Sequence, residues 1–328
     1  MKALVYTGTQ ELEIRDVDEA ELQAGQCLVD ISHCGICGSD MHAYHGADAR
    51  RVPPLVLGHE AVGIVRGGRY GGKRVAINPL MTCGHCSDCT TGREHLCVER
   101  ELIGMRVPGA FAQSVVVSED NIYPLPDDLA FEQAALAEPL ACAVHAVSIA
   151  IDQQVTAPED ANVTVLGGGA IGLLCALVFR LRGVRHLKIA ETNPLRRQVL
   201  QQVVDGQIYD PVATSPQQSK ADIVLDAVGS GITRAAASIL AKPGGVIVHI
   251  GLQDNNEGLD TRRLTLQEIT FVGTYCYKDN DFAEALSLLS KGAIKADGWT
   301  EYRGLESGAG AFRDIHNGSA LPKIILTT

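Results

Sequence analysis

From residue 162 onward, short apolar runs alternate with longer segments that carry apolar residues at helical spacing. The runs are rich in valine and isoleucine, which favour extended strands, and glycine or polar residues bound them. Strands that alternate with helices are typical of a parallel, doubly wound sheet. The expected strands are residues 162–166, 186–190, 221–229, 245–251 and 269–275, and the expected helices include residues 233–240 and 281–289.

One apolar stretch, residues 161–179, carries no charge and approaches the length of a membrane span. Four glycines interrupt it, and it opens with Val163-Thr164-Val165, so a strand, a glycine turn and a buried helix explain it better. The first residues contain only a short apolar run, Ala3 to Tyr6, which is too short for the core of a signal peptide. We therefore expect a cytoplasmic protein with no membrane partner.

The composition is that of a globular protein with two domains. The chain has 328 residues, of which 46% are hydrophobic and 20% are charged, so disorder is excluded and there is ample material for a core. It carries 28 basic and 39 acidic side chains, giving a formal net charge of −11. Such a charge repels a phosphate backbone, and we expect no nucleic-acid partner.

Four of the ten cysteines lie in one short loop, Cys83, Cys86, Cys89 and Cys97, separated by two, two and seven residues. Four thiolates at such spacing can surround one tetrahedral zinc ion. Two disulfides or an iron–sulfur cluster are the alternatives, and a reducing compartment disfavours the disulfides. Because four thiolates leave no position for water, the sequence predicts a structural zinc site here.

A second set of metal-ligand residue types is spread over the first half of the chain. Cys37, Ser39, Asp40 and His42 follow a strand-like alternation at residues 27–31. His59-Glu60 and, further on, Glu138 complete the set. Each of these residues alone has an ordinary explanation: Cys37 as a small buried side chain, His59 as a hydrogen-bonded core residue, Glu138 as an acid at a helix start. Only their combination indicates a joint site.

A glycine-rich turn follows the expected strand at residues 162–166. Its spacing, G-x-G-x-x-G, lets the backbone approach a pyrophosphate at a helix N-terminus. Glu191 immediately follows the next strand, about 20 residues beyond the last glycine, where an acid accepts hydrogen bonds from the adenosine ribose. Its charge would repel a 2′-phosphate and favours NAD, although Arg196 and Arg197 lie close enough to weaken this preference. The predicted cofactor residues are Gly167, Gly169, Ala170, Ile171, Gly172, Glu191 and Arg196.

Together these motifs resemble the zinc-dependent medium-chain alcohol dehydrogenase family, nearest its sorbitol (polyol) and threonine dehydrogenase branches. The resemblance covers essentially the whole chain. It implies an α/β fold with two parts: a GroES-like β-rich catalytic domain of residues 1–140 and 290–328, and a doubly wound Rossmann NAD-binding domain of residues 141–289. It also implies a homodimer or homotetramer and a small-molecule alcohol as substrate.

The resemblance implies that Cys37 and His59 are ligands of a catalytic zinc. In the polyol branch the third ligand is a glutamate at the position of Glu138, and Glu60 is the rival or exchanging ligand. Asp40 resembles the acid that orients the zinc-bound histidine.

The chemistry that the family implies is hydride transfer from a secondary alcohol or polyol to NAD. The alcohol oxygen binds zinc as an alkoxide, its proton leaves through Ser39 and then His42, and the carbinol hydride passes to the nicotinamide. As ordinary alternatives, Ser39 is a turn hydroxyl and His42 a surface histidine.

Two other functions remain open at this point. A zinc-free, NADPH-dependent quinone reductase of the same superfamily would lack the metal ligands, and Glu191 also disfavours it. A non-catalytic NAD-sensing protein would keep the fold without turnover.

Overall fold

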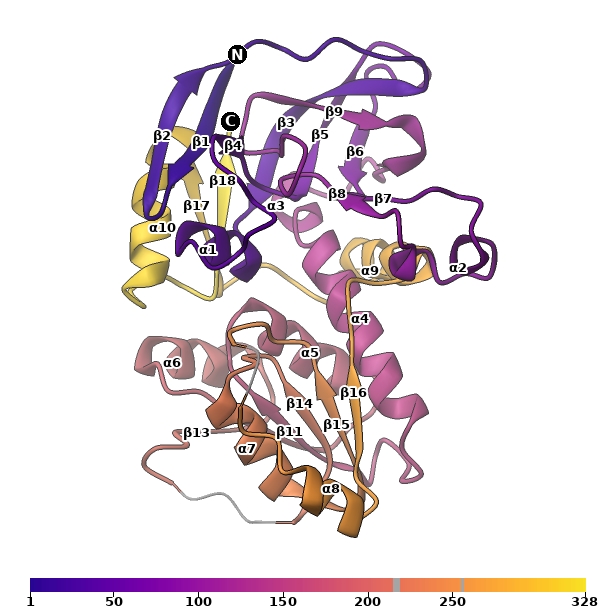
Figure 1. Ribbon diagram of the computed structural model, residues 1–328, viewed down its shortest axis with the longest axis vertical. Coiled ribbons are helices and arrows are strands. Elements are labelled where there is room, and N and C mark those ends of the chain that lie inside the picture. Colours follow the sequence, from indigo (N-terminus) through magenta and orange to yellow (C-terminus); the bar gives the residue numbers. More distant parts are fainter. Residues whose placement is uncertain (215–218, 255–256) are drawn as a thin grey trace. The chain divides into compact units, whose positions relative to one another are not determined.

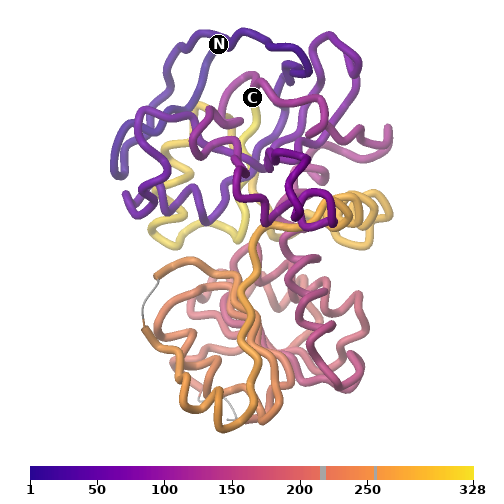
Figure 2. Tube along the Cα trace, turned by 45° about the vertical axis from the view of Figure 1, so that its right-hand side comes forward, coloured from indigo at the N-terminus to yellow at the C-terminus, as the bar shows by residue number. Residues whose placement is uncertain are grey.

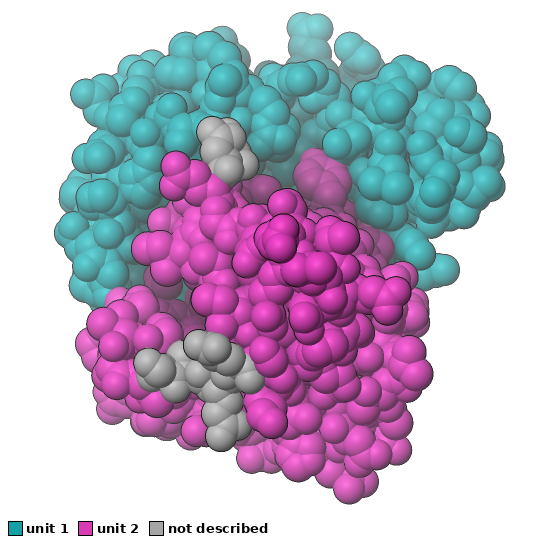
Figure 3. Space-filling view, turned by 60° about the horizontal axis from the view of Figure 1, so that its bottom comes forward, with its two compact units in different colours: residues 1–139, 278–328 teal, residues 140–277 magenta. Residues whose placement is uncertain are grey.

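The computed structural model describes residues 1–214, 219–254 and 257–328 of the chain. The described chain divides into two compact units (Figure 3). Unit 1 contains Met1–Pro139 and Lys278–Thr328, and unit 2 contains Leu140–Tyr277. Unit 2 is therefore an insertion between two sequence segments that fold together.

Unit 1 consists mainly of β-strands. They are β1 Lys2–Gly8, β2 Glu11–Asp16, β3 Gln26–Gly35, β4 Leu55–Val56, β5 Glu60–Arg66, β6 Arg74–Ile77, β7 Leu80–Met81, β8 Glu101–Leu102, β9 Ser114–Ser118, β10 Ile122–Pro124, β17 Thr300–Gly304 and β18 Lys323–Thr327. The main sheet has the order β10-β6-β5-β3-β18-β17, with β9 also pairing with β3. Smaller sheets have the orders β2-β1-β4 and β7-β8. Apolar strand side chains pack with Phe111 and Phe312 into the core of this unit.

Short helices connect these strands. They are α1 Gly38–Tyr44, α2 Ser87–Thr90, η1 Glu94–Leu96, η2 Glu119–Asn121, α3 Phe131–Ala134, α9 Asp279–Ser290, η3 Leu305–Ser307 and α10 Gly308–His316. A longer helix, α4 (Ala137–Asp152), begins in unit 1 and continues into unit 2.

The isolated run at the end of the sequence is a strand of the unit 1 sheet. β18 pairs antiparallel with β3 and parallel with β17 (Figure 1). Figure 2 shows the indigo and yellow ends of the chain within the same unit. The last strand of the chain therefore joins the main sheet of unit 1 beside β3.

Unit 2 is a parallel sheet of six strands. They are β11 Asn162–Leu166, β12 His186–Ala190, β13 Gln207–Tyr209, β14 Ala221–Asp226, β15 Ala241–His249 and β16 Thr270–Gly273, and the helices are α5 Ala170–Leu181, α6 Pro194–Val203, α7 Gly231–Leu240 and α8 Thr261–Leu266. The strand order is β13-β12-β11-β14-β15-β16. This is the Rossmann order, whose direction reverses between β11 and β14, and ligands bind beyond the strand ends at such a reversal.

The fold class predicted from the sequence is confirmed by this architecture. The strands β11 and β12 have the predicted bounds, whereas β14 ends at Asp226, three residues before the predicted end at Gly229. The helix predicted at residues 281–289 begins at Asp279, because Asp281 accepts a hydrogen bond from the N–H of Lys278 at 2.9 Å and so lies in the first turn. This helix, α9, falls in unit 1, whereas the predicted division placed it in the NAD-binding domain. The functional division of the chain stays a prediction.

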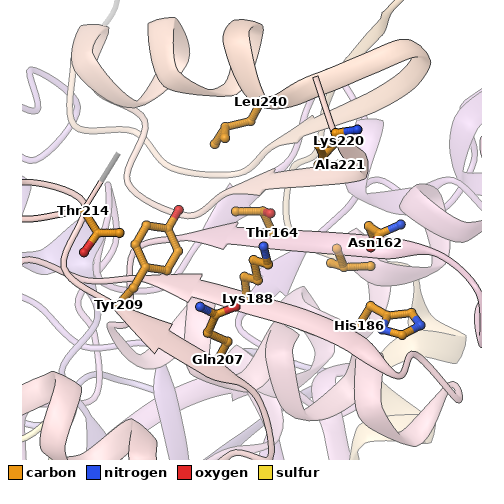
Figure 4. Close-up of a pocket in the computed structure, with 11 residues that line it drawn as sticks. Asn162, Thr164, His186, Lys188, Gln207, Tyr209, Thr214, Lys220, Ala221 and Leu240 are labelled. Carbon is orange, nitrogen blue, oxygen red and sulfur yellow. The ribbon is translucent and has the colours of Figure 1, made fainter. Parts of the chain in front are cut away.

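Within the described ranges, no helix combines the length and the hydropathy that a bilayer span needs. A pocket of about 360 Å³ lies on the unit 2 sheet (Figure 4). Thr164, Lys188 and Gln207 line it as register neighbours on β11, β12 and β13. The predicted cofactor residues are not among its lining residues.

Candidate functional site

Cys37 forms the turn between β3 and α1. It is the N-cap residue of α1, and its extended backbone, with φ −94° and ψ 155°, ends the strand and starts the helix. Its N–H donates to Oδ2 of Asp40 at 3.0 Å, and the N–H of Ser39 donates to its Sγ at 3.5 Å. These two contacts fix the direction of a half-buried thiol.

His59 directly follows Gly58 and precedes β5, which begins at Glu60. Gly58 has φ +95°, and a Cβ there would meet the ring of Phe111 at 2.6 Å, so only glycine fits this turn. His59 is 3% exposed, and its Nδ1 lies 3.5 Å from Oδ1 of the fully buried Asp40. The carboxylate therefore lies behind the imidazole ring, as an acid that orients a metal-binding histidine does.

The ligand atoms of Cys37, His59 and Glu60 all lie within 4.8 Å of one another. Oε1 of Glu60 is buried without a hydrogen-bond partner among the described residues, whereas Oε2 of Glu60 forms an ion pair with Lys323. Burial alone would lower the pKa of His59, but the charges of Asp40 and Cys37 hold that pKa well above its usual value. One sulfur, one imidazole and one carboxylate, in surroundings that favour positive charge, fit zinc. Three protein donors leave a position open, as in catalytic zinc sites.

Glu138 lies in the first turn of α4 and is 6% exposed. It is outside the three-donor group found among the described residues. Both Glu138 and Glu60 act on Lys323: burial would lower the pKa of this lysine, but the charges of Glu60, Cys37 and Glu138 raise it. The structure thus brings Glu60 to the cysteine and the histidine. Glu138 lies outside this group of donors, and its charge acts on the buried ammonium group of Lys323.

Ser39 and His42, predicted as proton carriers, lie on the same short helix, α1. Both side chains are partly exposed. Burial lowers the pKa of His42, and the charges of Arg51 and Arg50 lower it further while that of Asp48 raises it. The imidazole is therefore neutral near pH 7, a state in which it can accept a proton.

The four-cysteine loop is folded around one point. The sulfur atoms of Cys83, Cys86, Cys89 and Cys97 all lie within 4.8 Å of one another. Sγ of Cys89 is 3.9 Å from that of Cys83 and 3.5 Å from that of Cys86. Zinc–sulfur bonds of about 2.3 Å in a tetrahedron require sulfur separations of about 3.8 Å, whereas a disulfide requires about 2.0 Å. These distances fit a metal, and the ten cysteines are free thiols.

The glycine turn connects β11 to α5. Gly169 is the N-cap of α5, and Ala170, Ile171 and Gly172 form its first turn. A Cβ at Gly172 would lie 1.9 Å from the carbonyl oxygen of Gly167, so glycine is required for the helix to pack this close to the turn. The free N–H groups of this helix start can bind a pyrophosphate.

Glu191 is 6% exposed and lies beside the glycine turn. Its Oε2 accepts the N–H of Gly168 at 2.7 Å, and its Oε1 accepts that of Asn193 at 2.7 Å. Arg197 donates to the carbonyl oxygens of Glu191 and Thr192, at 2.9 Å and 2.6 Å.

Arg196 differs from its neighbour Arg197. Its Nε is buried without a partner among the described residues, and one of its Nη atoms would lie 3.8 Å from a Cβ on Gly169. Of the two arginines, Arg196 is the one placed to meet an anion at the turn.

Sequence reasoning missed two residues of the metal region, Lys323 and Arg51. Lys323 comes from the last strand and forms an ion pair with Glu60. Arg51 donates to the Oγ of Ser39 at 3.2 Å. The sequence contained a signal for Lys323, which is a lysine next to apolar residues in the last strand. A lysine inside a strand is buried only when it is paired. No pattern in the sequence indicated Arg51.

Comparison with known proteins gives consistent matches. The family model described as "Alcohol dehydrogenase GroES-like domain" matches residues 23–127, and that described as "Zinc-binding dehydrogenase" matches residues 170–291. A 2-dehydro-3-deoxy-L-galactonate 5-dehydrogenase from Pseudoalteromonas atlantica is 31% identical over 90% of this chain and 89% of that protein. A sorbitol dehydrogenase from Bombyx mori is 30% identical over 92% of this chain and 91% of that protein. The structure of a zinc-binding dehydrogenase from Sinorhizobium meliloti 1021 bound to NADP aligns with a TM-score of 0.87 and 27% identity, over 100% of this chain and 99% of that one.

Proposed function

The chain belongs to the zinc-dependent medium-chain alcohol dehydrogenase family, and we propose that it oxidises a secondary alcohol or polyol at a site built around Cys37, His59 and Ser39. It is a zinc-dependent, NAD(P)-linked dehydrogenase, as the matches to alcohol and polyol dehydrogenases indicate. The observation that carries the proposal is the convergence of the Cys37, His59 and Glu60 ligand atoms within 4.8 Å, with Asp40 behind the imidazole.

Cys37 and His59 would hold the catalytic zinc, with Glu60 or Glu138 as the third ligand. Zinc, when bound, supplies a Lewis acid that lowers the pKa of an alcohol. Glu60 is the nearer candidate, because it already shares the donor group with the cysteine and the histidine. Cys83, Cys86, Cys89 and Cys97 would hold a structural zinc, supported by their sulfur separations.

The reaction removes one hydride and one proton from the alcohol and leaves a carbonyl compound. NAD⁺ supplies the hydride acceptor. We assign the proton to the hydroxyl of Ser39, which can accept it on Oγ while its own hydrogen moves on. His42 lies three positions after Ser39 on α1, is neutral near pH 7 and can take that proton to solvent.

We propose NAD⁺ rather than NADP⁺ as the cofactor. Glu191 supports this choice, because a carboxylate that follows β12 and contacts the glycine turn would repel a 2′-phosphate. Arg196 opposes it, because its guanidinium lies close to Gly169. One structural relative is bound to NADP, which also bears against this choice.

We further propose a homodimer or homotetramer in the cytoplasm. The support for a cytoplasmic location is chemical: ten free thiols, four of them clustered for a metal, need a reducing compartment. The proposal of an oligomer is supported by the family, whose members usually form dimers and tetramers.

The test is a screen for NAD⁺ and NADP⁺ reduction with polyols, amino alcohols, sugar acids and simple secondary alcohols. The screen uses zinc-loaded protein with its metal content measured. Cys37→Ala removes the metal-binding thiol, and Cys34→Ala, on the buried neighbouring strand, is the matched control. We expect turnover of at least one secondary alcohol or polyol with NAD⁺. We expect Cys37→Ala to lose one zinc per chain and more than about a hundredfold in kcat, and Cys34→Ala to keep both.

Three results would contradict the proposal. Full activity and full zinc content in Cys37→Ala would refute the site. Zinc-loaded protein that binds NADH but turns over no alcohol would favour a sensor. Quinone reduction with NADPH by metal-free protein would favour the zinc-free branch of the superfamily.

A further inference from the structure

Arg51 is a fully buried cation next to the proposed proton carrier. Its side chain is 0% exposed. Nε donates to the carbonyl oxygen of Gly104 at 2.9 Å, one Nη donates to Oδ2 of Asp48 at 2.5 Å, and the other Nη donates to Oγ of Ser39 at 3.2 Å. All three nitrogens of the guanidinium thus donate a hydrogen bond, and the three acceptors belong to different residues of unit 1.

The contact with Ser39 has only one possible direction. A guanidinium carries hydrogen-bond donors and no acceptor, and it stays protonated in proteins. Oγ of Ser39 must therefore accept from Arg51, which occupies one of its two lone pairs. The other lone pair is left for an incoming hydroxyl hydrogen, and the hydroxyl hydrogen of Ser39 is left for a further acceptor.

The position of the guanidinium is itself fixed. Asp48 accepts from Arg51 and also from Arg50, whose Nε and Nη2 donate to its two oxygens at 2.8 Å and 2.9 Å. Burial would raise the pKa of Asp48, but the hydrogen bonds from Arg50 and the charge of Arg51 lower it to about 2. Asp48 is consequently ionised at every pH at which the enzyme works. Its carboxylate holds the buried guanidinium in place from one side while the carbonyl of Gly104 holds it from another.

We propose that Arg51 is a positioning residue for proton transfer, which holds the Ser39 hydroxyl so that one lone pair faces the reacting alcohol and its hydrogen faces the next carrier. This inference rests on the proposed function, because it assigns Arg51 a role only if Ser39 carries the proton. A serine without this donor rotates among three rotamers, and only some of them align the two proton transfers.

A purely structural role for Arg51 is the alternative, since one of its contacts joins it to Gly104 and another joins it to Asp48. A double-mutant cycle with Ser39 separates the two roles. The four proteins are wild type, Arg51→Gln, Ser39→Ala and the double variant, each checked for zinc content, NADH binding and thermal midpoint. Arg50→Gln is the matched control, because it removes a second cation from Asp48 and leaves the contact between Arg51 and Ser39.

We expect Arg51→Gln to lower kcat about tenfold or more with little change in KM for the alcohol. In the Ser39→Ala background, Arg51→Gln is expected to lower kcat less than about twofold, because the hydroxyl that Arg51 positions is absent. Arg51→Lys, which keeps a cationic donor, recovers part of kcat, and Arg50→Gln stays within about twofold of wild type. If Arg51→Gln fails to fold, as its zinc content and NADH binding would reveal, Arg51→Lys takes its place in the cycle.

Losses from the two single variants that multiply in the double variant would overturn the inference and leave the proposed function standing. Wild-type kcat in Arg51→Gln would do the same. Absence of turnover by the wild type with every alcohol of the panel would overturn both.

Discussion

Lys323, on the last strand of the chain, forms an ion pair with Glu60, and both side chains are only 1% exposed. Its Nζ also donates to the carbonyl oxygen of Ile36 at 2.9 Å. The C-terminal strand thus supplies the only positive charge that the described structure pairs with Glu60. A buried charge without a partner lowers the stability of the folded protein. This ion pair therefore couples the folding of the last strand to the charge on Glu60 in the metal site.

Replacing Lys323 by Met is expected to destabilise the metal-free protein by about 3 kcal/mol, because Glu60 is left as an uncompensated buried charge. Zinc brings positive charge to the same carboxylate, so the loss is expected to be smaller in the zinc-loaded protein. Denaturant unfolding of both forms measures this difference. Lys73→Met, at an exposed lysine, is the control and should leave the stability of both the metal-free and the zinc-loaded protein unchanged. Equal losses with and without zinc would contradict the coupling.

The four-cysteine loop makes a separate prediction. Cys97 is fully buried, whereas the other three cysteines of the loop are partly exposed. Cys97→Ser should lose one zinc per chain and lower the thermal midpoint by roughly 5 °C or more, since a structural zinc contributes directly to folding. The Cys97→Ser protein, which keeps its other zinc, should still turn over alcohol at low temperature. Cys27→Ala, at a buried cysteine outside the loop, should retain full zinc content. A Cys97→Ser protein with unchanged metal content would refute the structural site.

His42 should make stability depend on pH near neutrality. Burial, with the charges of Arg51 and Arg50, lowers its pKa below the ordinary value of 6.5, while Asp48 acts in the opposite direction. Below pH 6.5 the unfolded chain therefore binds a proton at this residue that the folded protein resists, and stability falls as the pH falls. Relative to wild type, His42→Gln should be more stable at pH 5 than at pH 8. Thermal midpoints of both proteins between pH 5 and 8 check this, and a difference that does not change with pH would contradict it.

The fold class and the four-cysteine cluster could be predicted from the sequence because both depend on local patterns. Strand–helix alternation predicted the parallel sheet of unit 2, and the spacing of Cys83, Cys86, Cys89 and Cys97 predicted a cluster that the structure brings together. A resemblance, and no pattern of spacing, joined Cys37 to His59. The choice between Glu60 and Glu138 needed the fold, since both are buried acids near Lys323.

The helix α10 was not predicted, and α4 was indicated only by the interpretation of Glu138 as an acid at a helix start. α6 had a visible start signal: Asn193 caps it, with Pro194 in its first turn. Arg51 could not be predicted at all, because its role depends on Gly104 and Ser39, and only the folded chain brings these two residues to one guanidinium.

Gly172 offers a test of the dinucleotide site that does not depend on the metal. A Cβ at this position would lie 1.9 Å from the carbonyl oxygen of Gly167, and that atom belongs to rigid backbone. Gly172→Ala must therefore push α5 away from the turn, which displaces the N–H groups that would bind a pyrophosphate. We expect NADH affinity to fall at least about tenfold, or about 1.4 kcal/mol, with the zinc content unchanged. Gly273→Ala is the matched control, since a Cβ there meets nothing within 4 Å and the backbone is not in the left-handed region. Fluorescence titration with NADH measures both variants, and wild-type affinity in Gly172→Ala would show that the dinucleotide binds elsewhere.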